Sequence, residues 1–325
     1  MAPRAPKPTQ RAPELIRAGP VGRMTALRRQ RLVGEFANFV LEQTGASWEL
    51  LVKDDLPRLS ALMREHGYAL YDASRPVGDL RDTLLGLTDA HGYARAAMSE
   101  TWRVVKTWEK IEPSEVRTPV PFDVFRAMKA TALAWGWQTI AVLLHVAFFC
   151  LLRPAELFGL RRSDILLVEM DAGIEWLVRL ARTKSWSRSS RSQYAKLDGR
   201  NVCAGCNLYV KSMPPTALLW PASPAAFAGR LRAVASAVTG TPSPYTVGSL
   251  RTGGATFLFR LWNEDLPRLC WRGRWKDVNT VWHYVQELQA AEISSSFPRA
   301  VQRRVEGLVS LLPALVEEWV LQESS

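Results

Sequence analysis

Three residues in the stretch "LLRPAEL" have the types and spacing of an anion-binding helix start. Proline fixes its own φ and disfavours the α conformation at the residue before it, so a helix should begin at Pro154 with Arg153 just outside it. The Arg153 guanidinium, the open backbone N–H groups and the positive end of the helix dipole can then face one anion, with Glu156 orienting the arginine. The same residues also fit a plain Arg153–Glu156 ion pair that closes a helix corner.

A second arginine, Arg251, stands in "YTVGSLRTGGATFLFR", residues 245–260, between a proline-rich approach and two adjacent glycines. The rest of this segment predicts an apolar helix. An arginine in such a helix indicates either an ordinary surface charge or part of a site that binds phosphate. Gly253 and Gly254 would let the helix pack closely against a neighbour.

A candidate nucleophile, Tyr284, lies in "GRWKDVNTVWHYVQELQ", residues 273–289. The spacing predicts one helix with an apolar stripe, and at 100° per residue Tyr284 falls at the edge of that stripe. The stripe consists of Val278, Val281, Trp282, Val285 and Leu288. An edge tyrosine can bury its ring and present its hydroxyl to a cleft, as a nucleophile requires, although most edge tyrosines serve packing alone.

These motifs need elements to position them, and the chain divides into three parts. Residues 1–23 are rich in Pro, Arg and Ala and predict a disordered basic arm. Apolar residues at three- and four-residue spacing predict a small all-helical domain over 24–112. A proline-rich stretch, "IEPSEVRTPVPF", then leads into a second domain over 113–325.

The second domain is expected to be mainly helical with a small hairpin. Ile174, Trp176, Val178 and Leu180 alternate as in a half-buried strand, "SWSRSSRS" predicts a turn, and "QYAKL" predicts the return strand. The hairpin tip would carry Lys184, Arg188 and Arg191. The end of the chain, "VQRRVEGLVSLLPALVEEWVLQ", predicts an amphipathic helix interrupted at Pro313 that covers its own core or docks on a neighbouring subunit.

The charge of the chain favours a polyanionic partner. The net charge is +11, residues 1–33 hold eight Lys and Arg against Glu14 alone, and residues 182–200 hold six against Asp198 alone. Nucleic acid is the first candidate and an anionic membrane the second, although a basic patch can also be a solvated protein face.

Several classes of protein are disfavoured by the remaining features. Four cysteines and an N-terminus without an apolar signal region predict an intracellular protein, in the nucleus if the source is eukaryotic and otherwise in the cytoplasm or nucleoid. Cys203 and Cys206 form one C-x-x-C without a second Cys/His pair, so a metal site is not expected. Gln138 and His145 interrupt the apolar run 135–152, which favours a helix buried in a core over a membrane span.

Taken in order, the motifs resemble the catalytic domain of the tyrosine recombinases, the phage-integrase family. The resemblance spans roughly residues 120–295, and "GRWKDVNTVWHYVQELQ" is most similar to members that have a tryptophan just before the nucleophile, including recombinase domains of eukaryotic mobile elements. Five motifs carry it: Arg153-x-x-Glu156-Leu, Arg182-Thr183-Lys184, Ser249-Leu250-Arg251, Gly273-Arg274-Trp275, and Tyr284. It implies a mainly α fold, with a helical core-binding domain before a mixed α/β catalytic domain that carries the hairpin sheet.

The resemblance also implies a mechanism of DNA recombination and integration without a cofactor. Tyr284 would attack the scissile phosphate to give a 3′-phosphotyrosine, and Arg153, Arg251 and Trp275 would hold the nonbridging oxygens. Lys184 would protonate the leaving 5′ oxygen, with Glu156 in support. Arg182, Arg188 and Arg191 would bind DNA, and the chain would work as a homotetramer on double-stranded DNA.

Gly248 departs from the family pattern. The family commonly has histidine three residues before the second arginine, and glycine can neither contact phosphate through a side chain nor handle the tyrosine proton. Replacing Gly248 with histidine is therefore expected to raise activity. Two alternatives follow: a DNA-binding descendant that has lost cleavage, and a type IB topoisomerase-like enzyme that does not exchange strands.

Overall fold

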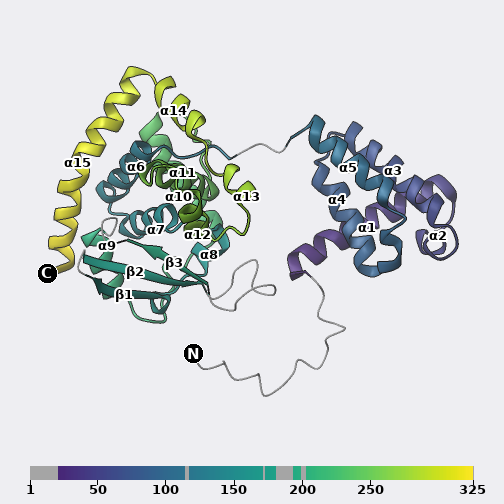
Figure 1. Cartoon of the computed structure of the whole chain (residues 1–325), viewed down its shortest axis with the longest axis horizontal. Coiled ribbons are helices and arrows are strands. Elements are labelled where there is room, and N and C mark those ends of the chain that lie inside the picture. Colours follow the sequence, from purple (N-terminus) through teal and green to yellow (C-terminus); the bar gives the residue numbers. More distant parts are fainter. Residues whose placement is uncertain (1–20, 114–116, 171–172, 181–192, 199–202, 325) are drawn as a thin grey trace, which may run out of the picture. The chain divides into compact units, whose positions relative to one another are not determined.

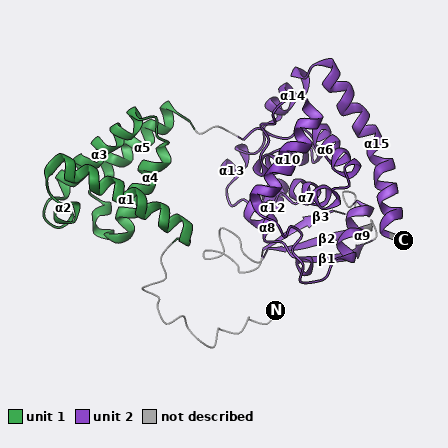
Figure 2. Cartoon of the chain, turned by 180° about the vertical axis from the view of Figure 1, so that it is seen from behind, with its two compact units in different colours: residues 1–115 green, residues 116–325 purple. Residues whose placement is uncertain are grey.

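The chain forms two compact units in a computed structural model that describes residues 21–113, 117–170, 173–180, 193–198 and 203–324. Unit 1 runs from Met1 to Glu115 and unit 2 from Val116 to Ser325. Figure 1 labels the helices and strands, and Figure 2 distinguishes the two units by colour. The boundary predicted from the sequence lies between residues 112 and 113.

Unit 1 is all helical, with one hydrophobic core. Its elements are α1 (Arg23–Thr44), α2 (Trp48–Asp54), α3 (Leu56–Asp72), α4 (Val77–Ala90), the 3₁₀ turn η1 (Gly92–Arg95) and α5 (Ser99–Ile111). Phe36 and Val40 of α1 meet Met63 of α3 and Leu84 of α4 in the core.

A buried histidine, His66, gives unit 1 a pH-dependent stability. Its ring lies between Phe36 and Phe39, at centroid distances of 5.4 and 5.1 Å. Burial lowers the pKa of His66 to about 4, although Glu35 acts in the opposite direction. The folded state therefore binds this proton more weakly than the unfolded state. The contribution is complete above a pH of about 6.5 and is lost as the pH falls toward 4, by about 3 kcal/mol.

Hydrogen exchange of α3 peptides in the full chain, corrected for the intrinsic pH dependence of exchange, measures this loss. His66→Leu is expected to flatten the pH dependence between 6.5 and 4, while His91→Gln leaves it in place. Equal pH dependence in the wild type and His66→Leu would contradict the assignment.

Unit 2 combines ten helices with a three-stranded sheet in the described residues. The helices are α6 (Phe122–Ala134), α7 (Gln138–Phe149), α8 (Pro154–Phe158), α9 (Ala204–Ser212), α10 (Pro224–Thr239), α11 (Val247–Leu261), α12 (Leu266–Gly273), α13 (Val278–Trp282), α14 (Glu287–Ser296) and α15 (Arg299–Ser324). A 3₁₀ turn, η2 (Arg162–Asp164), precedes the strands β1 (Ile165–Met170), β2 (Gly173–Leu180) and β3 (Gln193–Leu197). This confirms the predicted mainly α fold with a small sheet.

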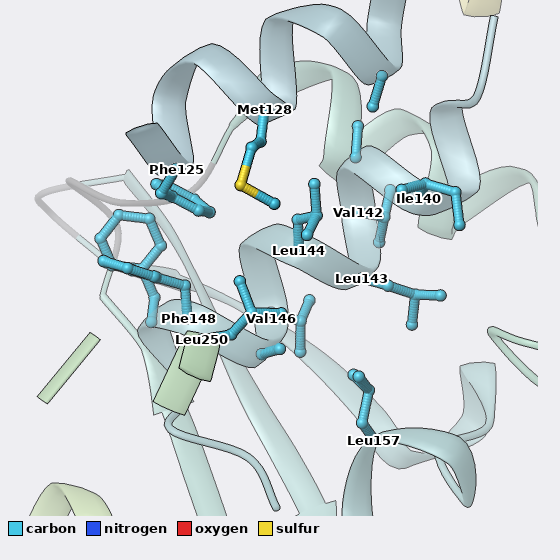
Figure 3. Close-up of a cluster of buried hydrophobic side chains, with 14 of the residues drawn as sticks. Phe125, Met128, Ile140, Val142, Leu143, Leu144, Val146, Phe148, Leu157 and Leu250 are labelled. Atoms are coloured by element: carbon cyan, nitrogen blue, oxygen red, sulfur yellow. The ribbon is translucent and has the colours of Figure 1, made fainter. Parts of the chain in front are cut away.

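Helix α7 forms the centre of the core of unit 2. All its residues from Ile140 to Phe149 are buried, so it is apolar on every side because every side meets protein. Figure 3 shows Met128 of α6, Leu250 of α11 and Leu157 of α8 in the cluster around it. The apolar run is thus a core helix, as predicted. In the described part of the chain no helix is long and apolar enough to cross a membrane.

The sheet contains the predicted hairpin and one further strand. Strands β2 and β3 pair antiparallel, with Trp176 opposite Leu197 and Leu180 opposite Gln193. The side chains of Trp176 and Leu180 are buried, as the alternation predicts. Strand β1 pairs with the other edge of β2. Its sequence, "ILLVEM", lacks a clear alternation, so no strand was predicted there.

Two glycines let α11 approach its neighbours backbone to backbone. A Cβ at Gly253 would overlap the Val120 carbonyl oxygen and lie 2.9 Å from its nitrogen. A Cβ at Gly254 would overlap the Phe148 carbonyl oxygen of α7 and lie 2.8 Å from Cδ2 of Leu151. Close packing at both positions agrees with the expectation from the sequence, and it fixes α11 against α7.

Gly254→Ala is accordingly expected to destabilise the protein. The new methyl group has to displace backbone, and such overpacking costs about 1–3 kcal/mol. Gly229→Ala, at an α10 position with no atom within 4 Å of the new Cβ, is the matched control. It should stabilise by roughly 0.5–1 kcal/mol, because alanine restricts the unfolded chain more than glycine does. Denaturant unfolding measures both, and equal signs would refute the packing argument.

The final helix, α15, is continuous through Pro313 and is not interrupted there. Its Val301, Val305 and Trp319 are buried, and the Trp319 ring lies against Gly205 of α9. Helix α15 packs along α6 and α9, as Figure 1 shows. Of the two roles left open by the sequence, α15 therefore covers the core of its own unit. This packing holds the helix together where proline removes a backbone hydrogen bond.

Candidate functional site

Three of the predicted site residues lie in direct contact. The rings of Trp275 and Tyr284 are 4.9 Å apart between centroids. The guanidinium carbon Cζ of Arg251 lies 4.6 Å from the centre of the Trp275 ring and 5.1 Å from that of Tyr284. Helix α11 supplies the arginine, the residue following the C-cap of α12 supplies the tryptophan, and the turn after α13 supplies the tyrosine.

A second part of the site consists of Arg153, Glu156 and Arg274. In the sequence, Arg274 stood out only as the middle residue of the motif Gly273-Arg274-Trp275. Arg153 is the N-cap of α8, as Pro154 predicted, and its Nη1 donates to Oε1 of Glu156 over 2.7 Å. The Arg153 backbone N–H donates to Oε2 of the same carboxylate. Arg274 donates from Nη2 to Oε2 of Glu156 over 2.9 Å. The buried carboxylate of Glu156 thus joins two arginines.

The charges around Glu156 explain its ionisation. Burial opposes the charged form, but Arg274 and Arg153 outweigh it and hold the pKa of Glu156 below its ordinary value. The pKa of Arg274 is lowered by burial, while Glu156 raises it. Buried charges are costly unless they are paired, and here the negative carboxylate and the positive guanidinium groups compensate each other. Glu156 therefore stays ionised and holds Arg153 and Arg274 together.

Arg251 is almost completely buried, at 1% exposure. Its Nη1 donates to the Leu151 carbonyl oxygen, and its Nη2 donates to the Gly273 carbonyl oxygen over 2.7 Å. Two of its N–H groups thus bind backbone and do not face solvent. Burial, with repulsion from Arg274 and Arg153, lowers the pKa of Arg251 to about 9. The guanidinium remains charged at neutral pH.

Two residues next to Arg251 and Glu156 have a strained backbone. Leu151 and Arg274 both have positive φ, at 49° and 57°. The left-handed region is unfavourable for residues with a Cβ, by about 1–2 kcal/mol each. The Leu151 carbonyl oxygen accepts hydrogen bonds from both Arg251 and Arg274. The strained turn therefore presents one acceptor to two buried arginines, and these bonds offset part of its cost.

Three buried donors in this cluster have no hydrogen-bond partner in the described part of the chain. They are Nε1 of Trp275, Nε of Arg251 and Nε of Arg274. A Cβ at Gly273 would overlap the Trp275 ring, so glycine at this position allows the ring to lie where it does. Buried polar groups are nearly always satisfied, so these donors favour an acceptor that a ligand would supply. An anion is the ligand that suits these donors.

Tyr284 is not on a helix, so this part of the prediction is wrong. Helix α13 ends at Trp282 and α14 begins at Glu287, with Tyr284 in the turn between them. Thr256 of α11 explains the break: its Oγ1 donates to the Tyr284 carbonyl oxygen over 3.1 Å and accepts from the Gln286 N–H over 3.0 Å. These bonds replace two that a continuous helix would make.

The predicted apolar stripe is wrong as well. Val281 is buried, whereas Val278, Trp282 and Leu288 are 42%, 51% and 82% exposed. The half-buried Tyr284 ring instead packs in a small core with Leu269, Trp275 and Val281.

The predicted basic residues of the hairpin tip lie outside the described residues. Lys184, Arg182, Arg188 and Arg191 belong to the connection between Leu180 of β2 and Gln193 of β3. The proton donor assigned to Lys184 and the DNA contacts assigned to the three arginines remain predictions.

The C-x-x-C pair lies at the start of α9, in the same unit. Cys203 is the N-cap of α9, and hydrogen bonding to Cys206, with a contribution from Lys129, lowers the pKa of Cys203 to about 5. Among the described residues no group of three or more His, Cys, Asp or Glu could hold a metal ion.

Comparison with known proteins places the fold. No family model and no curated protein matches the sequence. Among solved structures, the XerH site-specific recombinase bound to palindromic difH substrate in a post-cleavage complex has a TM-score of 0.51 at 14% identity, over 74% of this chain and 72% of that chain. The XerA recombinase has a TM-score of 0.39 at 15% identity, over 86% and 94%. The first similarity shows that the chain has the mainly α fold of a tyrosine recombinase.

Proposed function

We propose that the chain is a site-specific tyrosine recombinase that cleaves and rejoins double-stranded DNA through a 3′-phosphotyrosine. The observation that carries the proposal is the contact of Arg251, Trp275 and Tyr284, in which Nε of Arg251 and Nε1 of Trp275 are buried without a partner among the described residues. A phosphodiester provides the oxygens those donors require, and a tyrosine hydroxyl beside it is a nucleophile. The fold shared with XerH supports the same class.

Each residue has a role in this proposal. The Tyr284 hydroxyl attacks phosphorus, and the 5′ oxygen of the next nucleotide leaves with a proton from Lys184. Arg153, Arg251 and the Trp275 indole N–H hold the nonbridging oxygens, where negative charge grows in the transition state. Glu156 keeps Arg153 in place through the ion pair described above.

The proposal extends to the whole chain. Unit 1 acts as the core-binding half of a clamp around the duplex, and Arg182, Arg188 and Arg191 add phosphate contacts with the basic N-terminal arm. Strand exchange requires four copies on two duplexes, inside the cell, with no metal or nucleotide cofactor. The tryptophan before the nucleophile favours the mobile-element type of recombinase.

A second candidate function is DNA binding without cleavage. Gly248 favours it, because the motif histidine is absent, and so does Arg251, whose Nη1 and Nη2 bind carbonyl groups. A descendant of this kind would bind duplex DNA with a steep salt dependence and would form no covalent adduct.

A nicked suicide duplex separates the two functions. The nick lets the short 5′ fragment diffuse away after attack, so that a covalent protein–DNA adduct accumulates and migrates slowly in a denaturing gel. The recombinase should form this adduct without metal or ATP. Salt-dependent binding without any adduct would establish the second function instead, and a type IB topoisomerase-like enzyme would relax supercoils without joining two duplexes.

A further inference from the structure

The missing histidine leaves a position that another side chain fills. Gly248 is buried in the first turn of α11, three residues before Arg251, and residues three apart on a helix share a face. A Cβ at Gly248 would overlap Nη1 of Arg117 and lie 2.8 Å from both Cδ and Cζ of that side chain. The Arg117 guanidinium therefore occupies the space into which a histidine at residue 248 would project.

Backbone contacts hold Arg117 at this position. The Val120 N–H donates to the Ser249 carbonyl oxygen over 3.3 Å, and the Val120 backbone lies against Gly253. Residues 117–121 thus run along the first two turns of α11 before α6 begins. Because the segment is fixed at Val120, the side chain of Arg117 is delivered to Gly248 by the fold of unit 2.

No described side chain compensates the positive charge of Arg117 at the N-terminal end of α11. The N-terminal end of a helix carries partial positive charge, which disfavours a cation beside it. Among the described residues, the ion pairs of unit 2 do not include Arg117. Arg117 as a whole residue is exposed. A bound anion that contacts both the guanidinium and the helix end would stabilise both.

We propose that Arg117 contacts the scissile phosphate in place of the absent histidine, as a third phosphate-binding arginine beside Arg153 and Arg251. This inference rests on the proposed recombinase function. Arg117 would supply hydrogen bonds and positive charge to a nonbridging oxygen. A guanidinium does not accept a proton at neutral pH, so Arg117 replaces the phosphate contact of the histidine and not its proton transfer.

The first test measures the rate of adduct formation on the nicked suicide duplex. Arg117→Ala should slow it by about 10- to 150-fold, the equivalent of one charged hydrogen bond, and Arg117→Lys should recover part of the loss. Arg126→Ala, which removes an arginine of α6 that lies near exposed Asp123, is the matched control and should leave the rate unchanged.

A substrate with a neutral methyl group in place of one nonbridging oxygen distinguishes contact from structure. If Arg117 binds that charge, the defect of Arg117→Ala should shrink at least tenfold on a duplex with this methylphosphonate. An undiminished defect, or wild-type rates for Arg117→Ala on the ordinary phosphate, would overturn the inference while leaving the recombinase function intact.

Gly248→His provides the reciprocal test. In the wild type the new imidazole has to displace Arg117, so Gly248→His alone should not raise the rate, contrary to the expectation from the sequence. In the Arg117→Ala background the space is open, and Gly248→His should accelerate adduct formation. Equal effects in both backgrounds would contradict the proposal.

A binding measurement keeps the inference testable if the wild type forms no adduct, which would refute the proposed function. Inorganic phosphate should then shift the NMR signal of the Gly248 amide in the full chain, and Arg117→Ala should weaken that binding at least tenfold. A Gly248 signal indifferent to phosphate would overturn the phosphate contact itself.

Discussion

Tyr284→Phe is expected to abolish the covalent adduct on a nicked suicide duplex. The change removes only the hydroxyl, and the ring can keep its contacts with Trp275 and Arg251. Loss of the nucleophile from an enzyme with a covalent intermediate lowers its rate by roughly 10⁶-fold in well-studied cases. Denaturing gels of the protein with labelled DNA measure the adduct, and peptide mapping locates the linked residue.

Tyr194→Phe is the matched control for this prediction. Tyr194 lies on β3 of the same unit and is 57% exposed, so it loses a hydroxyl without disturbing the core. Duplex binding by Tyr284→Phe should match that of the wild type, because the phosphate contacts remain. An adduct that persists in Tyr284→Phe would show that another residue attacks the phosphate.

Glu156→Ala is expected to cause the largest loss of stability among single substitutions at the site. The Glu156 side chain is 2% exposed and forms ion pairs with Arg153 and Arg274. Its removal leaves buried Arg274 without a carboxylate, beside the positive charge of Arg251. Breaking a buried ion pair by removing one partner costs about 3–5 kcal/mol. Denaturant unfolding of the full chain measures the loss.

Asp123→Ala is the control, because the Asp123 side chain is 68% exposed and lies 3.7 Å from Arg126. Exposed pairs of this kind contribute about 0–1 kcal/mol. Acid should act in the same direction as Glu156→Ala. Since the folded pKa of Glu156 is lowered, its contribution is present above the unfolded value of roughly 4.3 and is lost as the pH falls through the folded value. If Glu156→Ala were no less stable than Asp123→Ala, the role assigned to the Glu156 carboxylate would be contradicted.

The sequence predicted those parts of the site that local patterns encode. Pro154 placed Arg153 before a helix, the alternation of Trp176, Val178 and Leu180 predicted β2, and the two glycines predicted the close packing of α11. Each of these depends on neighbours in the chain. The periodicity around Tyr284 failed because Thr256, on another helix, takes the backbone hydrogen bonds that would continue the helix.

Two contacts at the site that the sequence did not predict depend on segments far apart in the chain. Arg274 binds Glu156 from a left-handed backbone conformation. That conformation usually occurs at glycine or asparagine, so the sequence does not predict it at an arginine. Arg117 reaches Gly248 only because Val120 is fixed to Ser249. No local pattern predicts the contact that either arginine makes. The sequence therefore located the absent histidine but not the side chain that fills its place.

The close approach of residues 117–121 to α11 also has a mechanical consequence. Val120 meets Gly253 and Ser249 through backbone atoms, so no side chain can rotate to absorb a displacement between them. This segment directly follows the boundary between the two units. A displacement of residues 117–121 is therefore passed directly to the first turns of the helix that carries Arg251.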